Sequence, residues 1–125
     1  MKLPIRIAAL TIAATLVACG GAATAAPPTS SPTPSGVDVT LTLTEFAFDP
    51  SEAEVPAGSA VNFTLANKGT IEHDLTIDAL SFTLYAGVGE SPSLATGVLA
   101  AGTYDFYCSI PGHKEAGMTG TLVVK

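Results

Sequence analysis

Positive charge is scarce in this sequence. Two of its five basic residues, Lys2 and Arg6, lie at the extreme N-terminus, whereas all 11 acidic residues lie from Asp38 onward. A surface with so few lysines and so many carboxylates repels nucleic acid, so no nucleic-acid partner is expected. Such a surface suits a partner with a basic docking patch, or it serves solubility alone.

The sequence also lacks the residue patterns of common catalytic sites. It has two histidines and two cysteines, and it contains no Ser/His/Asp, glycine-rich phosphate-binding or zinc-type pattern. We therefore do not expect an enzyme. The 47% hydrophobic content excludes a chain that is disordered throughout. The length of 125 residues predicts one domain.

The N-terminal apolar run is too short to span a bilayer. It covers residues 7–17 and follows a basic segment, which is typical of an export signal. The run ends in "LVAC", which resembles the lipobox of bacterial lipoproteins. This resemblance implies cleavage before Cys19 and acylation of its thiol. The alternative is an ordinary signal peptide that is cut after Ala25 or Ala26, with Cys19 discarded.

Residues 20–36 contain no charge and no large apolar side chain. Their proline, serine, threonine and alanine content predicts a semi-flexible tether. We therefore expect a signal peptide at 1–18, a tether at 19–36 and a folded domain at 37–125. This order places the domain outside the cytoplasm, either on the outer face of the plasma membrane or facing the periplasm. Acyl chains on Cys19 would anchor it to the membrane.

The domain alternates apolar and polar residues with the period of β-strands. The predicted strands are "VDVTLTLTEF", "AVNFTL", "HDLTI", "GTYDFYC" and "GTLVVK". Turn-forming stretches separate them, namely "DPSEAEVPAGS", "NKGT", "GVGESPS", "AAGT" and "SIPGHKEAG". No stretch has a convincing helical period. The pattern predicts an all-β fold, either a Greek-key sandwich or a barrel.

One loop near the C-terminus, "YCSIPGHKEAGM", concentrates potential soft-metal ligands. Cys108, His113 and Met118 follow one another with four residues in each gap. Cys108 is the only thiol of the domain, so it has no disulfide partner there. The other histidine, His73, opens the predicted strand "HDLTI". Two histidines, a cysteine and a weak axial methionine describe a blue-copper electron-transfer site.

Each candidate ligand has a plainer interpretation when it is taken alone. A histidine before a strand is usually a surface or capping residue, and a lone methionine or cysteine is usually packed in a core. Their joint occurrence favours one mononuclear site. A dinuclear copper centre would need a second cysteine in the loop. A trinuclear cluster would need histidines beside Cys108, where Tyr107 and Ser109 stand.

Two segments, "YCSIPGHKEAGMTGTLVV" and "HDLTI", resemble the ligand segments of the cupredoxin family, the plastocyanin and azurin group. The resemblance covers about residues 37–125 and implies a β-sandwich in which His73, Cys108, His113 and Met118 bind one copper ion. It implies a monomeric carrier of single electrons, alternating between Cu(I) and Cu(II) and serving membrane-associated redox proteins. The loop is longer than that of plastocyanin and is similar to that of rusticyanin-like proteins.

The resemblance also implies roles for neighbours of the ligands. Asp74 stands where the family usually has Asn or Asp, and we expect it to bond near Ser109 and brace the ligand segments. The alternative is a solvated aspartate and a turn serine. The exposed edge of His113 is the implied electron port. Tyr107 points to the opposite face of its strand from Cys108 and is either plain packing or a second electron route.

Two other functions remain open at the level of the sequence. One is a copper storage or delivery protein, and the other is a small copper enzyme similar to nitrosocyanin. A delivery protein usually has an exchangeable site rich in Met or His, and this domain has only one methionine. A nitrosocyanin-like site would have a carboxylate or water where Met118 is expected. Both considerations favour the electron carrier.

Overall fold

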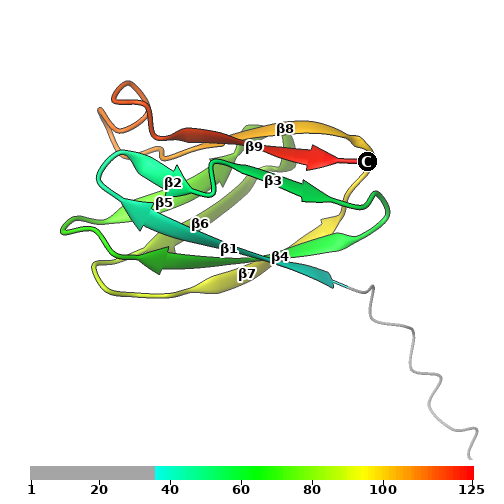
Figure 1. Ribbon diagram of the computed structural model, residues 1–125, viewed down its shortest axis with the longest axis horizontal. Coiled ribbons are helices and arrows are strands. Elements are labelled where there is room, and N and C mark those ends of the chain that lie inside the picture. Colours follow the sequence, from blue (N-terminus) through cyan, green and yellow to red (C-terminus); the bar gives the residue numbers. More distant parts are fainter. Residues whose placement is uncertain (1–35) are drawn as a thin grey trace, which may run out of the picture.

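The computed structural model describes residues 36–125 and shows two β-sheets packed face to face (Figure 1). One sheet has the strand order β2-β1-β4-β7, and the other has the order β3-β9-β8-β5-β6. The strands are β1 (Gly36–Thr44), β2 (Ala47–Asp49), β3 (Glu52–Val55), β4 (Ala60–Asn67), β5 (His73–Ile77), β6 (Phe82–Ala86), β7 (Ser93–Val98), β8 (Gly102–Tyr107) and β9 (Thr119–Val124). The predicted all-β Greek-key fold is confirmed.

The described part of the chain contains one short 3₁₀ helix, η1 (Asp78–Leu80). Within residues 36–125 no helix is long and apolar enough to cross a bilayer. The predicted signal peptide, Cys19 and the tether up to residue 35 lie outside the described residues. The first strand begins at Gly36, one residue before the expected start of the domain.

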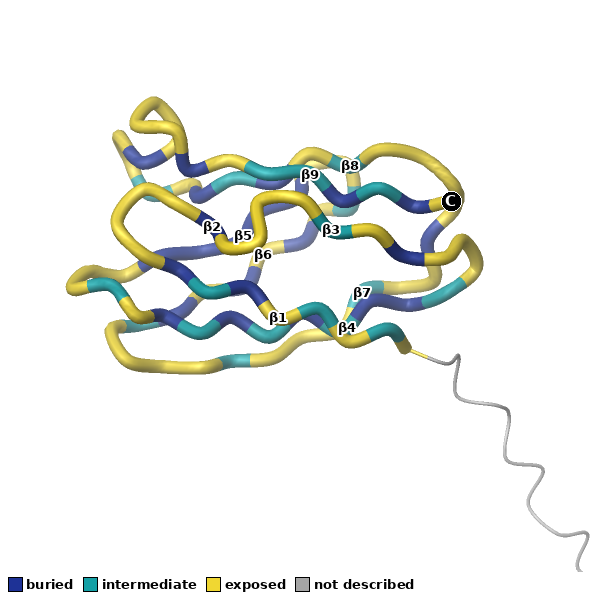
Figure 2. Tube along the Cα trace, in the orientation of Figure 1, coloured by how far each residue is buried: buried dark blue, intermediate teal, exposed yellow. Residues whose placement is uncertain are grey.

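Alternation along the strands builds the core between the sheets. Strands β1 and β4 pair in parallel, with Val39 opposite Phe63 and Leu41 opposite Leu65, so apolar side chains share the inner face. The second sheet contributes its own buried apolar side chains, including Leu75, Ile77, Phe106 and Leu122. Figure 2 shows buried positions alternating with more exposed ones along β9. Strand β5 is buried at every position, which gives it a fixed place in the fold.

Four strands were missed from the sequence, and one of them lies in a stretch that we predicted to be a turn. That stretch, "DPSEAEVPAGS", contains β3, which pairs in parallel with β9. Its glutamates are exposed and prolines flank it, so pairing with β9 rather than local propensity makes it a strand. The predicted turn "GVGESPS" ends in Ser93, the first residue of β7. Strands β2 and β6 were also unassigned.

Three connections meet at one end of the sandwich, opposite the C-terminus (Figure 1). They are the β1–β2 turn at residues 45–46, the β4–β5 loop at 68–72 and the β8–β9 loop at 108–118. We call this the loop end. The candidate ligands at 73, 108, 113 and 118 all lie here, because β5 begins and β8 stops at this edge of the sheet.

Close packing at Gly120 predicts a large cost for even one methyl group. A β-carbon at Gly120 would lie 2.2 Å from Phe106 Cε2 and 2.5 Å from the backbone oxygen of Ser51. We expect Gly120→Ala to lower the free energy of unfolding by about 1–3 kcal/mol, measured by urea denaturation, because the core must shift to admit it. The control is Gly97→Ala, where a β-carbon meets nothing within 4 Å. Equal losses in the two variants would contradict this packing.

Candidate metal centre

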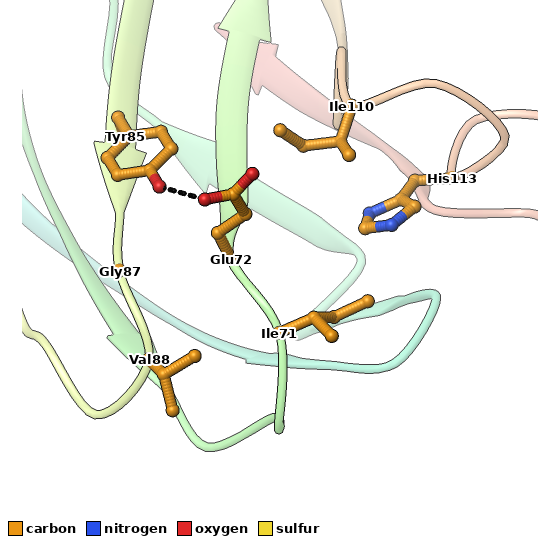
Figure 3. A pocket seen from close by; sticks show the side chains of 7 residues that line it. All are labelled: Ile71, Glu72, Tyr85, Gly87, Val88, Ile110 and His113. Carbon is orange, nitrogen blue, oxygen red and sulfur yellow. Dashed lines mark hydrogen bonds between the residues drawn. The ribbon is translucent and has the colours of Figure 1, made fainter.

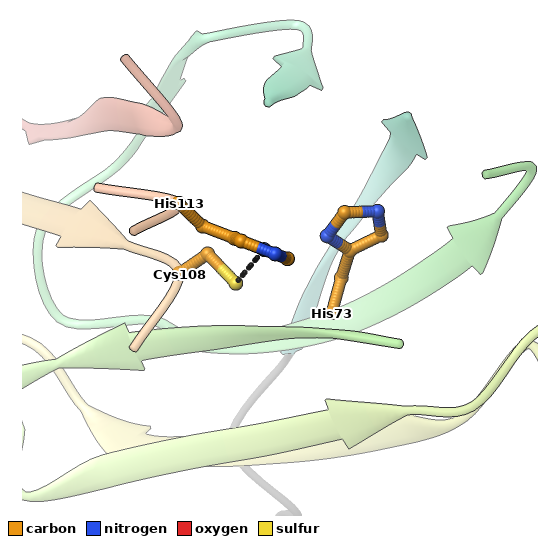
Figure 4. A group of neighbouring side chains, drawn as sticks. All are labelled: His73, Cys108 and His113. Atoms are coloured by element: carbon orange, nitrogen blue, oxygen red, sulfur yellow. Dashed lines mark hydrogen bonds between the residues drawn. The ribbon is translucent and has the colours of Figure 1, made fainter. Parts of the chain in front are cut away.

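Three of the predicted ligands converge at the loop end (Figure 4). Donor atoms of His73, Cys108 and His113 all lie within 4.8 Å of one another. Sγ of Cys108 lies 3.3 Å from Nδ1 of His113. Both histidines and the cysteine are buried, with His113 the most accessible at 6% exposed. Residues 35 positions apart in the sequence are therefore brought into one small buried cluster.

Backbone hydrogen bonds fix the β8–β9 loop around this cluster. The amide of Cys108 donates to the carbonyl of Met118 at 3.1 Å, and the amide of Met118 donates to the carbonyl of His113 at 3.0 Å. The amide of His113 donates in turn to the carbonyl of Ile110 at 3.1 Å. Gly112 has a φ of +86°, which favours glycine and lets the chain turn just before His113. The loop is therefore held by its own backbone bonds.

His73 lacks the hydrogen bonds that a buried imidazole needs. Neither Nδ1 nor Nε2 has a partner among the described residues, although the ring is fully buried. Figure 4 shows one ring nitrogen facing the other two side chains and the other pointing away. A buried polar atom without a partner is costly, so each such atom calls for an explanation. A metal ion between the three side chains would satisfy the nitrogen that faces them.

The surroundings of the cluster disfavour charge while no metal is bound. Burial raises the pKa of the Cys108 thiol, while hydrogen bonds from the backbone of Asp74 and Ile110 oppose that rise. Burial and the neighbouring His113 lower the pKa of His73, which keeps its imidazole neutral. Metal ions bind neutral imidazoles and thiolates. The imidazole of His73 is therefore already in the neutral form that binds a metal, whereas the thiol of Cys108 must release a proton when a metal binds.

The family of cupredoxin-like domains matches this chain over residues 7–124. The chain belongs to this family. The match spans every described strand of the fold. It also includes each of the four predicted ligands.

Individual relatives agree with this assignment. The chain is 31% identical over 98 residues to the copper-resistant cuproprotein CopI of Rubrivivax gelatinosus, an alignment that covers 62% of this chain and 59% of CopI. It is 34% identical over 103 residues to plastocyanin of Dryopteris crassirhizoma, covering 71% of this chain and 98% of that protein. The structure of auracyanin from Roseiflexus castenholzii superposes with a TM-score of 0.64 at 22% identity, covering 71% and 97% of the two chains, which shows the shared fold.

The donor set of this cupredoxin fits copper. Two imidazoles and a thiolate are soft enough for Cu(I) and also suit Cu(II). Met118, the fourth predicted ligand, is fully buried in the same apolar cluster as Cys108. Backbone hydrogen bonds join Met118 to Cys108 and to His113, so this buried residue lies next to two of the converging ligands and is withheld from water. Copper is therefore the cofactor that the family and the buried donors indicate together.

Asp74 links the segments that carry the first histidine and the cysteine. One carboxylate oxygen accepts a hydrogen bond from the backbone amide of Ser109 at 2.7 Å, and the other accepts one from the Ser109 hydroxyl. The backbone amide of Asp74 also points at Sγ of Cys108, 3.5 Å away. The predicted contact between Asp74 and Ser109 is therefore present, and the alternative of a solvated aspartate does not describe it.

Tyr107 lies on the surface side of β8 and makes specific contacts there. Its hydroxyl donates to both carboxylate oxygens of Asp78, at 3.0 and 3.1 Å. The ammonium of Lys114 lies 3.8 Å from the centre of its ring. The Tyr107 ring is therefore held by a hydrogen bond and a cation–π contact as well as by packing. The hydrogen bond to Asp78 also raises the pKa of Tyr107.

An apolar rim surrounds the most accessible ligand, and the sequence did not reveal it. We define the His113 patch as Ile71, Val88, Ile110 and the edge of His113, which line one pocket together with Glu72, Tyr85 and Gly87 (Figure 3). Phe46 of the β1–β2 turn packs edge-on against the His113 ring, with 5.2 Å between ring centres. These side chains come from four separate connections, β1–β2, β4–β5, β6–β7 and β8–β9, so no periodic pattern could have indicated them.

Proposed function

We propose that this protein is a one-electron carrier with a single copper centre held by His73, Cys108, His113 and Met118. The observation that carries the proposal is the buried cluster of one thiol and two imidazoles, one of which has no other partner. Copper bound there supplies one-electron chemistry by alternating between Cu(I) and Cu(II). The protein supplies the fixed ligands and the exclusion of water.

Rigid placement of the ligands suits electron transfer rather than metal exchange. His73 begins a strand that is buried along its whole length, and Cys108 directly follows another strand. The loop between Cys108 and Met118 is tied by its own backbone bonds. Ligands held in this way change little between oxidation states, so little reorganisation opposes the movement of an electron. A fixed site of this kind also gives no easy route for metal release.

The His113 patch is the proposed electron port. His113 is the most accessible of the three converging ligands, and exposed apolar side chains surround it, with Ile71 38% and Val88 59% exposed. An apolar rim lets a partner approach closely without trapping charged groups. The domain carries three lysines against 11 acidic residues, so we expect redox partners with basic residues around an apolar contact. Tyr107 is the candidate for a second route.

Copper delivery is the second candidate function. Similarity to the copper-resistant cuproprotein CopI favours it, although this chain spans 59% of that protein's length. A small copper enzyme similar to nitrosocyanin would need an open coordination position. Met118, which is fully buried, stands where such a site would have a carboxylate or water, and this argues against an open position. We therefore place electron transfer first and do not propose an enzyme.

We propose that the domain works outside the cytoplasm as a tethered monomer. The support comes from the sequence, in which an export signal at 1–18 ends before Cys19 and an uncharged stretch at 19–36 precedes the domain at 37–125. An acylated Cys19 would hold the domain at the membrane. Mass spectrometry of the N-terminal peptide from membranes tests this directly. Cleavage after Ala25 or Ala26 would contradict it.

Voltammetry combined with chelation distinguishes the two candidate functions. We expect the copper-loaded protein to give one reversible one-electron wave and to keep its copper when it is reduced in the presence of a Cu(I) chelator. A delivery protein would surrender Cu(I) to the chelator within the same time. Loss of most of the copper on reduction would therefore reject the electron carrier in favour of delivery.

A further inference from the structure

A carboxylate of the β1–β2 turn reaches across the loop end. Oε1 of Glu45 accepts hydrogen bonds from the backbone amide of Thr70 and from its hydroxyl, the latter at 2.9 Å. The bonds from Thr70 lower the pKa of Glu45 to about 2, so the carboxylate is charged at neutral pH. Glu45 thereby connects two segments that are far apart in the sequence, and one of them leads directly into His73.

Gly69 brings this carboxylate close to the first histidine. A β-carbon at Gly69 would lie 2.8 Å from Oε1 of Glu45 and 2.9 Å from Nε2 of His73. Both atoms therefore face the same small space, which a side chain at position 69 would fill. Glycine leaves that space open. The loop preceding the histidine thus allows an acidic oxygen and an imidazole nitrogen to approach each other.

The His73 nitrogen beside Gly69 is the one that points away from the proposed copper site. Figure 4 shows that one ring nitrogen of His73 faces Cys108 and His113, while the other points away. Since Nε2 is the atom next to Gly69, Nδ1 is the one that faces the other two donors. Nε2 has no hydrogen-bond partner among the described residues, although the ring is fully buried. It is therefore an unpartnered polar atom beside the small space at Gly69 that Oε1 of Glu45 also lines, together with Oδ1 of Asn67, which lies 3.2 Å from the same β-carbon position.

We propose that Glu45 is a positioning residue for the copper ligand His73, and that its negative charge lowers the reduction potential of the centre. This inference rests on the proposed function. A metal-bound histidine usually directs its second ring N–H at a carboxylate, a carbonyl or water, which fixes its tautomer and its orientation. In this proposal the Glu45 carboxylate is the acceptor for Nε2–H of His73. A negative charge there favours the oxidised centre, which carries one more positive charge than the reduced one.

A substitution that removes the negative charge of Glu45 but keeps a side-chain oxygen tests the proposal. Glu45→Gln keeps an oxygen that can accept from Thr70, so the link across the loop end can persist. We expect the ratio of reduced to oxidised protein at a fixed potential to rise about three- to tenfold, because the lost charge no longer favours the oxidised state. Redox titration followed by visible absorbance measures this ratio. An unchanged ratio would overturn the proposal.

Glu72→Gln is the matched control. It removes the same charge from the residue next to His73, but the Glu72 carboxylate is bonded to the hydroxyl of Tyr85. We expect a clearly smaller change in the ratio for this variant. An equal change in both variants would mean that the centre senses only the overall charge of the loop end. That outcome would also overturn the role of Glu45.

A measurement without copper separates this inference from the proposed function. Ring ¹⁵N spectra of the metal-free protein at neutral pH should show His73 with its proton on Nε2. In Glu45→Gln that proton should exchange faster with solvent. A proton held on Nδ1, or equal exchange in both proteins, would reject the contact even if copper binds as proposed. Failure of the wild type to bind copper would instead reject the proposed function and leave these spectra interpretable.

Discussion

Cys108→Ser should abolish the intense visible absorption of the copper-loaded protein. That absorption requires a copper–thiolate bond, and Cys108 is the only cysteine among the described residues. A serine hydroxyl in the same buried position is a poor ligand, because it does not ionise near neutral pH. We therefore expect affinity for Cu(I) to fall by at least about 100-fold, since imidazoles alone are less suited to that ion than a thiolate. Absorption spectroscopy and competition with a Cu(I) chelator measure the two effects.

The matched control for this variant is Met118→Leu. Both positions are fully buried in the same core cluster, and both substitutions remove sulfur from it. A weak axial thioether tunes the centre without creating its colour, so Met118→Leu should stay intensely coloured with an altered potential. Equal loss of colour in both variants would point to a general collapse of the loop. Persistent colour in Cys108→Ser would exclude Cys108 as the ligand.

Asp74→Ala should loosen the copper centre and destabilise the metal-free fold. The substitution leaves the amide and hydroxyl of Ser109 without their acceptor, and it separates the two ligand segments that the carboxylate joins. We expect a loss of about 1–3 kcal/mol in the free energy of unfolding. We also expect copper affinity to fall about 10- to 100-fold, as is common when hydrogen bonds that hold the ligand segments in place are lost. Urea denaturation and chelator competition measure these changes.

Asp105→Ala is the control for the loss of an aspartate from the same sheet. Its carboxylate is exposed and has one contact, from the Thr121 hydroxyl at 3.5 Å. We expect its unfolding free energy to change by less than about 0.5 kcal/mol and its copper affinity to be unaltered. If Asp74→Ala behaved like this control, the bonds between Asp74 and Ser109 would have no part in holding the ligand segments.

Strands were predicted well from the sequence wherever apolar and polar residues alternate along them. In β1 and β4 apolar residues recur at every second position over most of the strand, so both strands were found. Strand β3 was missed because its exposed glutamates and flanking prolines resemble a turn. Its partner β9 lies almost 70 residues further on. No local property of the sequence reports a pairing at that distance.

The chemistry of the site was readable from the sequence, but its surroundings were not. Cys108, His113 and Met118 stand in one loop, and the donor types alone suggested a soft metal. The contact of Phe46 with His113 and the bond from Thr70 to Glu45 both join separate connections across the loop end. Such contacts depend on how the two sheets place their ends in space. They therefore required the structure.

The central claim is a single copper centre built on one thiolate and two imidazoles. Titration of the metal-free protein with Cu(II), followed by visible absorbance, tests this claim most directly. We predict an intense blue band that grows linearly and stops at one copper per protein, and that disappears on reduction and returns on reoxidation. A pale spectrum without a thiolate band, or saturation at more than one copper, would contradict it.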